Sequence, residues 1–444
     1  MAKLGRKSIS SRVPALSRRG FLAASLFPLP ASGRDPLRSS VETAREELTR
    51  RFLDPWGTLY HYVGLKGEVI RPTAEHCRAN QPSIMSWSTP IEDGPFYGGL
   101  YLMGLTARAR RLRTPSAATD AARMAHGLVR LARASAEDAF IVRGLCADGK
   151  SHYAASSEDQ FYPWFLGLWT YLRSPLPSAS DRAGIRSELL RAGTAIEKHG
   201  WRVPCSPRSF GYRGTYLRAT AFDSARLLSL LLMLHDLTGD RHWRAEYERR
   251  LEECPAPDSF TRLELCAQGI QYVETGETNL WTRSMGVAAL RMLMDAGSDP
   301  SHRKRFQQGL LASARAAAPH VARYRGFDAG KNLAFDPDWR FLNASWKPHT
   351  NADDGNLLAR SLLPLWAARN PLSVYEDQCM REPLFAAWIV TLAADPTLLA
   401  AHADTIRPAL LHFRWSRLYN SSFFVCVNTY YEGIRWGLAD PAGA

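Results

Sequence analysis

The chain has 444 residues, of which 45% are hydrophobic and 22% charged, and its formal net charge is +13. This apolar content is ordinary for a globular protein. The charged residues are rich in Arg but mixed in sign, without a run of about five or more like charges, which argues against a dedicated nucleic-acid binder. No long linker rich in Ser, Gly or Pro interrupts the chain, so we expect one domain rather than several.

The N-terminus differs from the rest of the chain. Residues 1–33 contain six Lys or Arg and no acidic residue, so the chain without them has a net charge of +7. The segment Ser17–Leu22 (SRRGFL) resembles a twin-arginine export signal, with Ala23 where that pattern has Lys. The apolar run that follows is about a dozen residues, too short for the ~20 that span a bilayer. We therefore expect a signal peptide at 1–33, handled by the twin-arginine export machinery, and one domain at 34–444 in the periplasm or outside the cell.

The rest of the chain lacks a stretch of about 18 uncharged apolar residues, so no stable membrane insertion is expected after signal cleavage. The seven cysteines are odd in number and show no C-x-x-C pair. Because twin-arginine substrates fold in the reducing cytosol, we do not expect a disulfide framework. Most cysteines should be small buried hydrophobic residues.

Long, nearly uncharged helical stretches recur along the chain. Their starts are marked by Gly94, Glu158, Arg218 (leading to Asp223), Asn279, Asp354 and Asn428. The gaps of 64, 60, 61, 75 and 74 residues each fit two helices with their loops. A helix that is apolar on all sides is buried, whereas one with a single apolar stripe is half-exposed. Alternation of the two predicts an all-α fold, an (α/α)6 toroid with an inner ring of helices inside an outer ring.

The predicted elements follow this alternation in chain order. The first, outer helix should start at Ser39, which has capping-box spacing to Glu42, and should end at Asp54. Its apolar stripe comprises Val41, Ala44, Leu48 and Phe52. Inner helices are expected at 96–105, 161–171, 219–234, 280–295, 355–368 and 428–437. Outer helices are expected at 117–135, 181–199, around Trp243, Tyr247 and Leu251, at 302–318 and at 381–398. Short strands near 138–154 or 322–346 could form a hairpin. In the inner ring, Gly98, Gly99 and Gly104 would permit close helix approach.

Acidic residues gather at the predicted starts of the inner helices, where unpaired N–H groups stabilise anions. These acids are Glu92, Asp93, Glu158, Asp159, Asp223 and Asp353. Each could be a simple helix cap. Caps do not require aromatic neighbours, however, and aromatic residues flank these starts, among them Trp87, Tyr97 and Trp164. Because sugars stack on aromatic rings while their hydroxyls bind carboxylates, we expect a polar, glycan-binding bowl at the centre of the ring.

The motifs Glu92-Asp93-Gly94-Pro95-Phe96 and Ser157-Glu158-Asp159-Gln160-Phe161 resemble those of the six-hairpin carbohydrate-active enzymes, distantly the unsaturated glucuronyl and rhamnogalacturonyl hydrolases. In that group two carboxylates near inner-helix starts carry catalysis. The resemblance implies that Asp93 and Asp159, 66 residues apart, are the catalytic pair, with Glu92, Glu158 and Asp223 in reserve. One carboxyl would protonate the leaving oxygen and the other would act as base or nucleophile.

A second constellation keeps a polysaccharide lyase open as an alternative. Such lyases on the same toroid use Tyr or His as base, with a cation or donor that stabilises the enolate-like intermediate. The candidate catalytic histidine is His349. The accompanying substrate-binding candidates are His152, Tyr153, Tyr216, Arg218, Trp346 and Asp353. The simpler interpretations are a surface or capping His349, a loop His152, and an Arg218 that pairs with Asp223.

No metal or cofactor is expected. The chain lacks H-E-x-x-H, a phosphate-binding loop, a dinucleotide fingerprint and a G-x-S-x-G elbow. A third hypothesis is a non-catalytic glycan-binding protein, for which the carboxylates would be dispensable. The expected partner is in every case an oligo- or polysaccharide.

Overall fold

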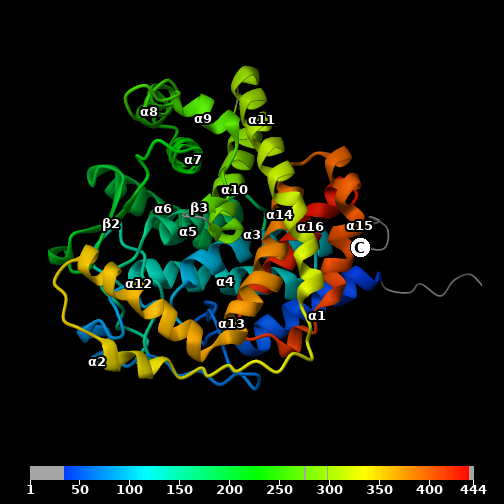
Figure 1. The fold of residues 1–444 in the computed structure, drawn as a ribbon. Helices are drawn as coiled ribbons and strands as arrows, with labels where there is room; N and C mark the ends of the chain where they lie inside the picture. Colours follow the sequence, from blue (N-terminus) through cyan, green and yellow to red (C-terminus); the bar gives the residue numbers. More distant parts are fainter. Residues whose placement is uncertain (1–34, 275–276, 298, 440–444) are drawn as a thin grey trace, which may run out of the picture. The chain divides into compact units, whose positions relative to one another are not determined.

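The apolar stretches fold as helices in the computed structural model, which describes residues 35–274, 277–297 and 299–439 (Figure 1). The described chain is mostly helical, so the all-α prediction is confirmed. The longer helices before residue 275 are α1 (Pro36–Glu47), α3 (Gly94–Leu112), α4 (Pro115–Arg133), α5 (Glu158–Leu172), α6 (Ala179–Lys198), α7 (Ala221–Thr238) and α8 (Arg241–Leu251). Those after it are α10 (Leu280–Ala296), α11 (Pro300–Ala317), α12 (Ala352–Arg369), α14 (Glu382–Leu392), α15 (Pro396–His412) and α16 (Val425–Gly433). Shorter helices are α2 (Ala74–Ala79), α9 (Arg262–Gln268) and α13 (Pro371–Glu376).

The largely apolar helices α3, α5, α7, α10, α14 and α16 are buried along most of their length. Helix α3 packs against α5 and α16, α7 packs against α10 and touches α5, and α14 packs against α10 and α16. Helices α4, α6, α8, α11, α15 and α1 pack beside them. Each of these buries a stripe, such as Trp243, Tyr247 and Leu251 of α8, while its other face contacts solvent.

Glycine permits the closest of these approaches. A Cβ on Gly99 of α3 would lie 2.1 Å from the Pro163 carbonyl oxygen of α5, and one on Gly167 of α5 would lie 2.2 Å from the Gly99 carbonyl oxygen. Gly104 faces Asn428 of α16 with the same lack of space. The expected role of Gly99 and Gly104 in close helix packing is therefore confirmed.

For the fifth predicted pair of helices, 355–368 and 381–398, the sequence pattern names the wrong helix as the buried one. Helix α14, in the segment predicted to be an outer helix, is completely buried. Helix α12, predicted to be inner, is half-exposed and leaves Leu357, Leu363 and Leu365 in contact with solvent. The reason is visible in the residues, since 383–392 contain no charge whereas α12 carries Asp353, Asp354, Arg360 and Arg369. The prediction followed the two acids at the start of α12 and not the absence of charge in residues 383–392.

Several predicted boundaries are also wrong. Helix α1 starts at Pro36 with Asp35 as its N-cap, not at Ser39, because the Asp35 carboxylate accepts the Leu37 N–H at 3.0 Å. Its buried stripe is as predicted. Helix α16 starts before Asn428, whose amide donates to the Leu100 carbonyl. The strands lie outside the predicted ranges, in two antiparallel pairs, β1 (Arg202–Pro204) with β2 (Tyr212–Thr215) and β3 (Val273–Glu274) with β4 (Glu277–Thr278).

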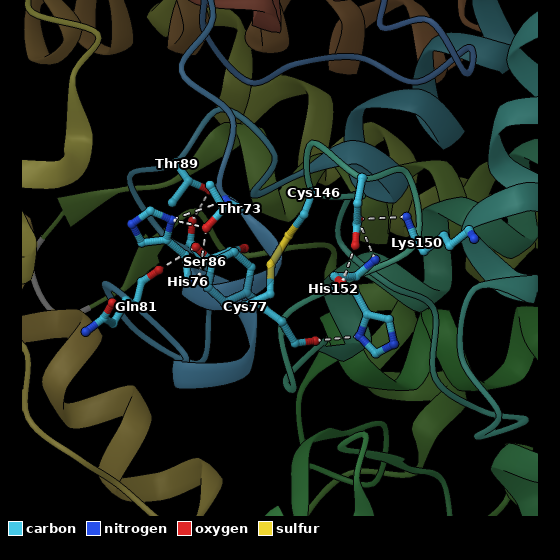
Figure 2. The surroundings of a disulfide bond; sticks show 12 residues. Thr73, His76, Cys77, Gln81, Ser86, Thr89, Cys146, Lys150 and His152 are labelled. Atoms are coloured by element: carbon cyan, nitrogen blue, oxygen red, sulfur yellow. Dashed lines mark hydrogen bonds between the residues drawn. A yellow bond between two sulfur atoms is a disulfide. The ribbon is translucent and has the colours of Figure 1, made fainter.

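The structure contains a disulfide bond between Cys77 of α2 and Cys146, in the loop between α4 and α5, which the sequence did not lead us to expect (Figure 2). The two cysteines are 69 residues apart, and only the tertiary fold brings them together. Of the free cysteines in the described chain, Cys205, Cys266 and Cys426 are buried, as expected for most of them. The predicted signal peptide lies outside the described residues, and within them no helix has the length and apolarity to cross a membrane.

We predict that Gly99→Ala destabilises the fold, because its methyl group would overlap the backbone of α5. Overpacking of this kind costs about 1–3 kcal/mol in the free energy of unfolding. Gly184→Ala on α6 is the matched control, since its new Cβ would have no neighbour nearer than 3.8 Å. Urea denaturation should show a loss for Gly99→Ala and a gain of about 0.5–1 kcal/mol for Gly184→Ala. Equal stability of Gly99→Ala and the wild type would contradict the close approach of α3 and α5.

Candidate active site

A cavity of about 1590 Å³ is lined by the loop before α3, the N-terminal ends of α5, α7 and α10, and residues of α12, α13 and the turn after it. It is larger than the roughly 300–1,000 Å³ typical of small-molecule pockets. Seven of the residues selected from the sequence line it, namely Trp87, Glu92, Asp93, Glu158, Asp159, Arg218 and Asp223. The starts of α3 and α5 thus open into one shared cavity.

Asp93 is buried at the start of α3, and its side chain does not cap that helix. Gln160 of α5 takes over this task, since its Oε1 accepts the Phe96 N–H at 3.2 Å. The other end of the same amide donates to Asp93 Oδ1 at 2.7 Å. Asp93 Oδ2 lies 3.0 Å from His61 Nδ1, and Arg143 approaches Oδ1 at 3.4 Å. Both carboxylate oxygens therefore have partners, and Asp93 has a role other than a cap.

Glu92 and Asp93 are neighbours in sequence but differ in protonation. Burial raises the pKa of Glu92 to about 7, assisted by the charge of Asp93, although His61 opposes the shift. Burial also acts to raise the pKa of Asp93, but the hydrogen bond and charge of His61, together with Arg143 and Gln160, lower it overall. A pair of acids whose environments separate their pKa values is the arrangement that acid–base catalysis requires.

His61 joins the two acids. Its Nδ1 lies 3.1 Å from Glu92 Oε1 and 3.0 Å from Asp93 Oδ2, and its ring stacks on buried Tyr97 with centroids 5.1 Å apart. Burial lowers the pKa of His61, but the charges of Glu92, Asp93 and Asp377 raise it overall. The donor atoms of His61, Glu92 and Asp93 all lie within 4.8 Å of one another, close enough for a cation. Their separations are those of hydrogen bonds, however, and Arg143 adjoins them, so we assign the group to proton sharing.

A second group of charges lies at the starts of α5 and α7. The fully buried Arg226 of α7 donates to Asp159 Oδ1 at 2.9 Å and to Asp223 Oδ1 at 2.7 Å. Arg218 bonds Glu158 Oε1 at 2.9 Å and also lies 3.6 Å from Asp223, so its pairing is broader than expected. Burial and the charge of Asp159 raise the pKa of Glu158. Of these three acids, Asp159 is the most accessible, with 34% of its side chain exposed.

A third group lies at the start of α10. Glu382 Oε2 accepts the Leu280 N–H at 2.7 Å and so caps this helix from α14. The neighbouring Arg381 guanidinium stacks over the Trp281 ring at 4.3 Å. Trp281 remains partly exposed to the cavity and packs on Phe96, with centroids 5.2 Å apart. Arg381 and Phe96 thus cover part of the indole, and the rest of it lines the cavity.

The other selected residues lie outside the lining of this cavity. Tyr97, Trp164 and Tyr216 are buried, where Trp164 donates to the Leu128 carbonyl and Tyr216 to the Glu158 carbonyl. His152 lies beside the disulfide loop (Figure 2) and packs on Phe140. The buried Tyr153 hydroxyl donates to the Gln81 carbonyl.

The predicted group before α12 is likewise separate from the cavity. Trp346 donates to the Asn80 carbonyl at 3.1 Å, and Asp353 is exposed in the first turn of α12. His349 lines a smaller hollow of about 640 Å³ beside exposed leucines of α12. The structure thus brings together the acids at the starts of α3, α5 and α7 but not His349 and His152.

Several lining residues were missed from the sequence. They are His61, Arg143, Gln160, Trp281, Asp377 and Arg381. Gln160 could have been found, since it directly follows Asp159 in the same motif. His61 and Arg143 lie in loops without periodicity, and only the packing of those loops against α3 brings them to Asp93.

The comparisons with known proteins give no family assignment. No family model matches the chain, no curated protein matches it, and no solved structure matches it. The site is therefore interpreted from its own geometry.

We predict that Glu92→Gln changes how stability depends on pH. Wild-type Glu92 keeps its proton in the folded state up to about pH 7, whereas the unfolded chain releases it near the ordinary value of 4.5. The folded state then binds more protons, so the free energy of unfolding falls as pH rises between these two values.

Glutamine has no proton to release. The free energy of unfolding of Glu92→Gln should therefore rise relative to that of the wild type, by up to about 3 kcal/mol across this pH interval. Urea denaturation at several pH values measures the difference. Exposed Glu248→Gln on α8 is the control and should show no such trend. A constant difference between Glu92→Gln and wild type would show that the Glu92 pKa is not raised.

Proposed function

We propose that this protein is an exported glycan-degrading enzyme, most simply a glycoside hydrolase on an (α/α)6 toroid. The observation that carries the proposal is the pair Glu92 and Asp93, whose pKa values are shifted in opposite directions at the wall of a cavity about 1590 Å³ in volume. Such a cavity has room for several sugar units, and the partly exposed Trp87 in its lining offers an aromatic surface for stacking.

The helix contacts support the toroid. The neighbours run from α3 to α5, α7, α10, α14 and α16 and return to α3, which is the circular order of an inner ring. Helices α4, α6, α8, α11, α15 and α1 then alternate with them in the chain as the outer ring. In this arrangement α14 replaces α12 as the fifth inner helix, and α12 contributes to the rim of the cavity.

Glu92 is suited to be the general acid. With a pKa of about 7 it holds a proton at neutral pH and can release it to a leaving glycosidic oxygen. Asp93, with both oxygens bonded, keeps Glu92 protonated through its like charge rather than touching the substrate. Asp159 is suited to be the base or nucleophile, because it is accessible and its position is fixed by Arg226. The sequence pattern predicted Asp93 and Asp159 as the catalytic pair. In this proposal Glu92 takes the place of Asp93, and Asp159 keeps its role.

The hydrolysis follows from these positions. Glu92 donates its proton to the departing sugar oxygen as the bond to the anomeric carbon breaks. Asp159 either deprotonates an attacking water or attacks the anomeric carbon itself. Positive charge that develops on the sugar ring is stabilised by the surrounding carboxylates.

A lyase is the second candidate, favoured by the arginines that line the cavity. They are Arg143, Arg213, Arg218, Arg283, Arg323, Arg360 and Arg381. Guanidinium groups bind carboxylates in a bidentate manner, so a uronate-containing glycan fits this lining under either mechanism. His349 and His152 are not in the lining, and the base would be Tyr62 or His61. Ultraviolet absorbance by an unsaturated product distinguishes β-elimination from hydrolysis, which releases reducing ends alone.

The disulfide supports export in general, because disulfides persist in oxidising compartments. The twin-arginine route in particular rests on the segment Ser17–Leu22. The test is Arg18→Lys with Arg19→Lys, which keeps the charge but removes the twin-arginine pair. We expect the uncleaved double variant to accumulate in the cytosol, as measured by cell fractionation. Unchanged export of the double variant would contradict a twin-arginine route.

We predict that Glu92→Gln and Asp159→Asn each lower kcat by about 100- to 10,000-fold, the usual contribution of a positioned acid or base. The assay measures reducing ends and ultraviolet absorbance on a panel of neutral and uronic-acid polysaccharides. Glu248→Gln and Asp404→Asn, both on exposed helix faces, are matched controls that should keep full activity.

Circular dichroism establishes that each variant is folded. If Glu92→Gln and Asp159→Asn keep wild-type turnover on an identified substrate, the hydrolase assignment is wrong. If the protein binds a glycan that neither it nor the variants cleave, the third hypothesis, a non-catalytic glycan-binding protein, replaces it.

A further inference from the structure

His61 and Glu92, which lie together beside Asp93, compete for one proton. His61 Nδ1 faces both Glu92 Oε1 and Asp93 Oδ2, and the pKa values of both His61 and Glu92 are raised. The proton can therefore reside on the Glu92 carboxyl beside a neutral imidazole, or on an imidazolium beside two carboxylates. Only the first state gives Glu92 a proton to donate. The far nitrogen of His61, Nε2, decides between the two, because an imidazolium must place a hydrogen there.

The group that faces Nε2 is the side-chain amide of Asn420, with Nδ2 at 3.4 Å. The orientation of this amide follows from its other contacts. Asn420 Oδ1 accepts the Ser422 N–H at 2.8 Å, and Nδ2 donates to Asp377 Oδ1 at 3.2 Å. A flipped amide would lose the Ser422 bond and place its oxygen against the Asp377 carboxylate. A donor therefore faces Nε2, which suits an unprotonated nitrogen and opposes an N–H.

The backbone around Asn420 is held firmly against His61. The buried Glu376 carboxylate accepts the N–H groups of Tyr419 and Asn420 at 2.9–3.1 Å. The Ser421 N–H donates to the His61 carbonyl at 2.9 Å, and Val63 donates to the Tyr419 carbonyl at 3.0 Å. The Asn420 amide thus cannot move away from the imidazole without breaking the backbone hydrogen bonds between residues 61–63 and 419–421.

We infer that Asn420 is a positioning residue, which fixes His61 as the tautomer with hydrogen on Nδ1 and so keeps the exchangeable proton of the cluster on Glu92. The consequence for catalysis rests on the proposed function, but the tautomer itself does not. In this tautomer the Nδ1–H donates to the two acids and Nε2 accepts from Asn420.

Several titratable and charged groups surround His61. They are Glu92, Asp93, Asp377, Tyr62, Tyr97 and Arg143. The three acids favour an imidazolium by charge, whereas Asn420 is the neighbour that opposes a hydrogen on Nε2. Replacing the donor end of this amide with an acceptor should therefore move the proton from Glu92 to His61.

The first experiment uses the wild-type protein. Two-dimensional ¹H–¹⁵N spectra of protein labelled at histidine nitrogens distinguish the two tautomers from the imidazolium, and the His61 signals are assigned by their absence from His61→Gln. We expect Nδ1 protonated and Nε2 unprotonated at neutral pH. An imidazolium signature for His61 at neutral pH would overturn the inference, whether or not a substrate has been found.

The second experiment uses Asn420→Asp, which offers Nε2 an acceptor. We expect His61 to become an imidazolium in these spectra, kcat to fall at least about 100-fold, and the basic limb of its pH profile to move down by about one unit or more. Ser422→Ala, which keeps the backbone N–H that Asn420 accepts, is the matched control and should retain the wild-type spectrum and profile. A folded Asn420→Asp protein with neutral His61 would contradict the inference.

The two failures can be told apart. If His61 shows the expected tautomer but Glu92→Gln remains fully active, the proposed function fails and the tautomer assignment stands. If Glu92→Gln is inactive but His61 is an imidazolium in the wild type, the function stands and Asn420 has no such role.

Discussion

The site depends on the burial of the Asp93 carboxylate and on the partners that make this burial tolerable. An isolated buried carboxylate costs several kcal/mol, and the cost is met only by hydrogen bonds and opposite charge. The chain supplies these from three separate segments, with His61 before α2, Arg143 in the loop after α4, and Gln160 in the first turn of α5. Because each partner needs its own segment in place, the carboxylate ties loops that have no regular structure to the ends of α3 and α5.

This same burial separates the acids chemically. Asp93 has enough partners to stay ionised, and its charge then acts on Glu92, whose carboxylate is buried beside it and has fewer hydrogen bonds. At the starts of α5 and α7 the balance is different, since Arg226 and Arg218 pair with three acids. On one wall of the cavity, Glu92 therefore holds a proton. On another wall, the accessible Asp159 carboxylate is fixed beside the Arg226 guanidinium. A glycan held between them would meet both groups.

The sequence predicts the helices well because their signal is local. Largely apolar stretches such as those of α3, α5 and α7 are too long for ordinary strands and are typical of buried helices. The acids at their starts are found where the pattern places them. The interchange of α12 and α14 shows the limit of that signal, since an acidic start was given more weight than the apolar run of residues 383–392. His61, Arg143 and Asn420 could not be found in this way. They act through contacts between segments separated by up to 359 residues, and nothing in the local pattern of a loop encodes such a distance.

The central claim is that Glu92 holds a proton at neutral pH chiefly because it is buried, with the charge of the neighbouring Asp93 adding to the shift of its pKa. It is tested most directly by following the side-chain carboxyl carbon of Glu92 by ¹³C NMR as pH is raised, with the signal assigned by its absence from Glu92→Gln. The account predicts a titration midpoint near pH 7, well above the ordinary value of 4.5. A midpoint at or below 4.5 would contradict it, because Glu92 would then have no proton to donate under the conditions in which the enzyme is proposed to act.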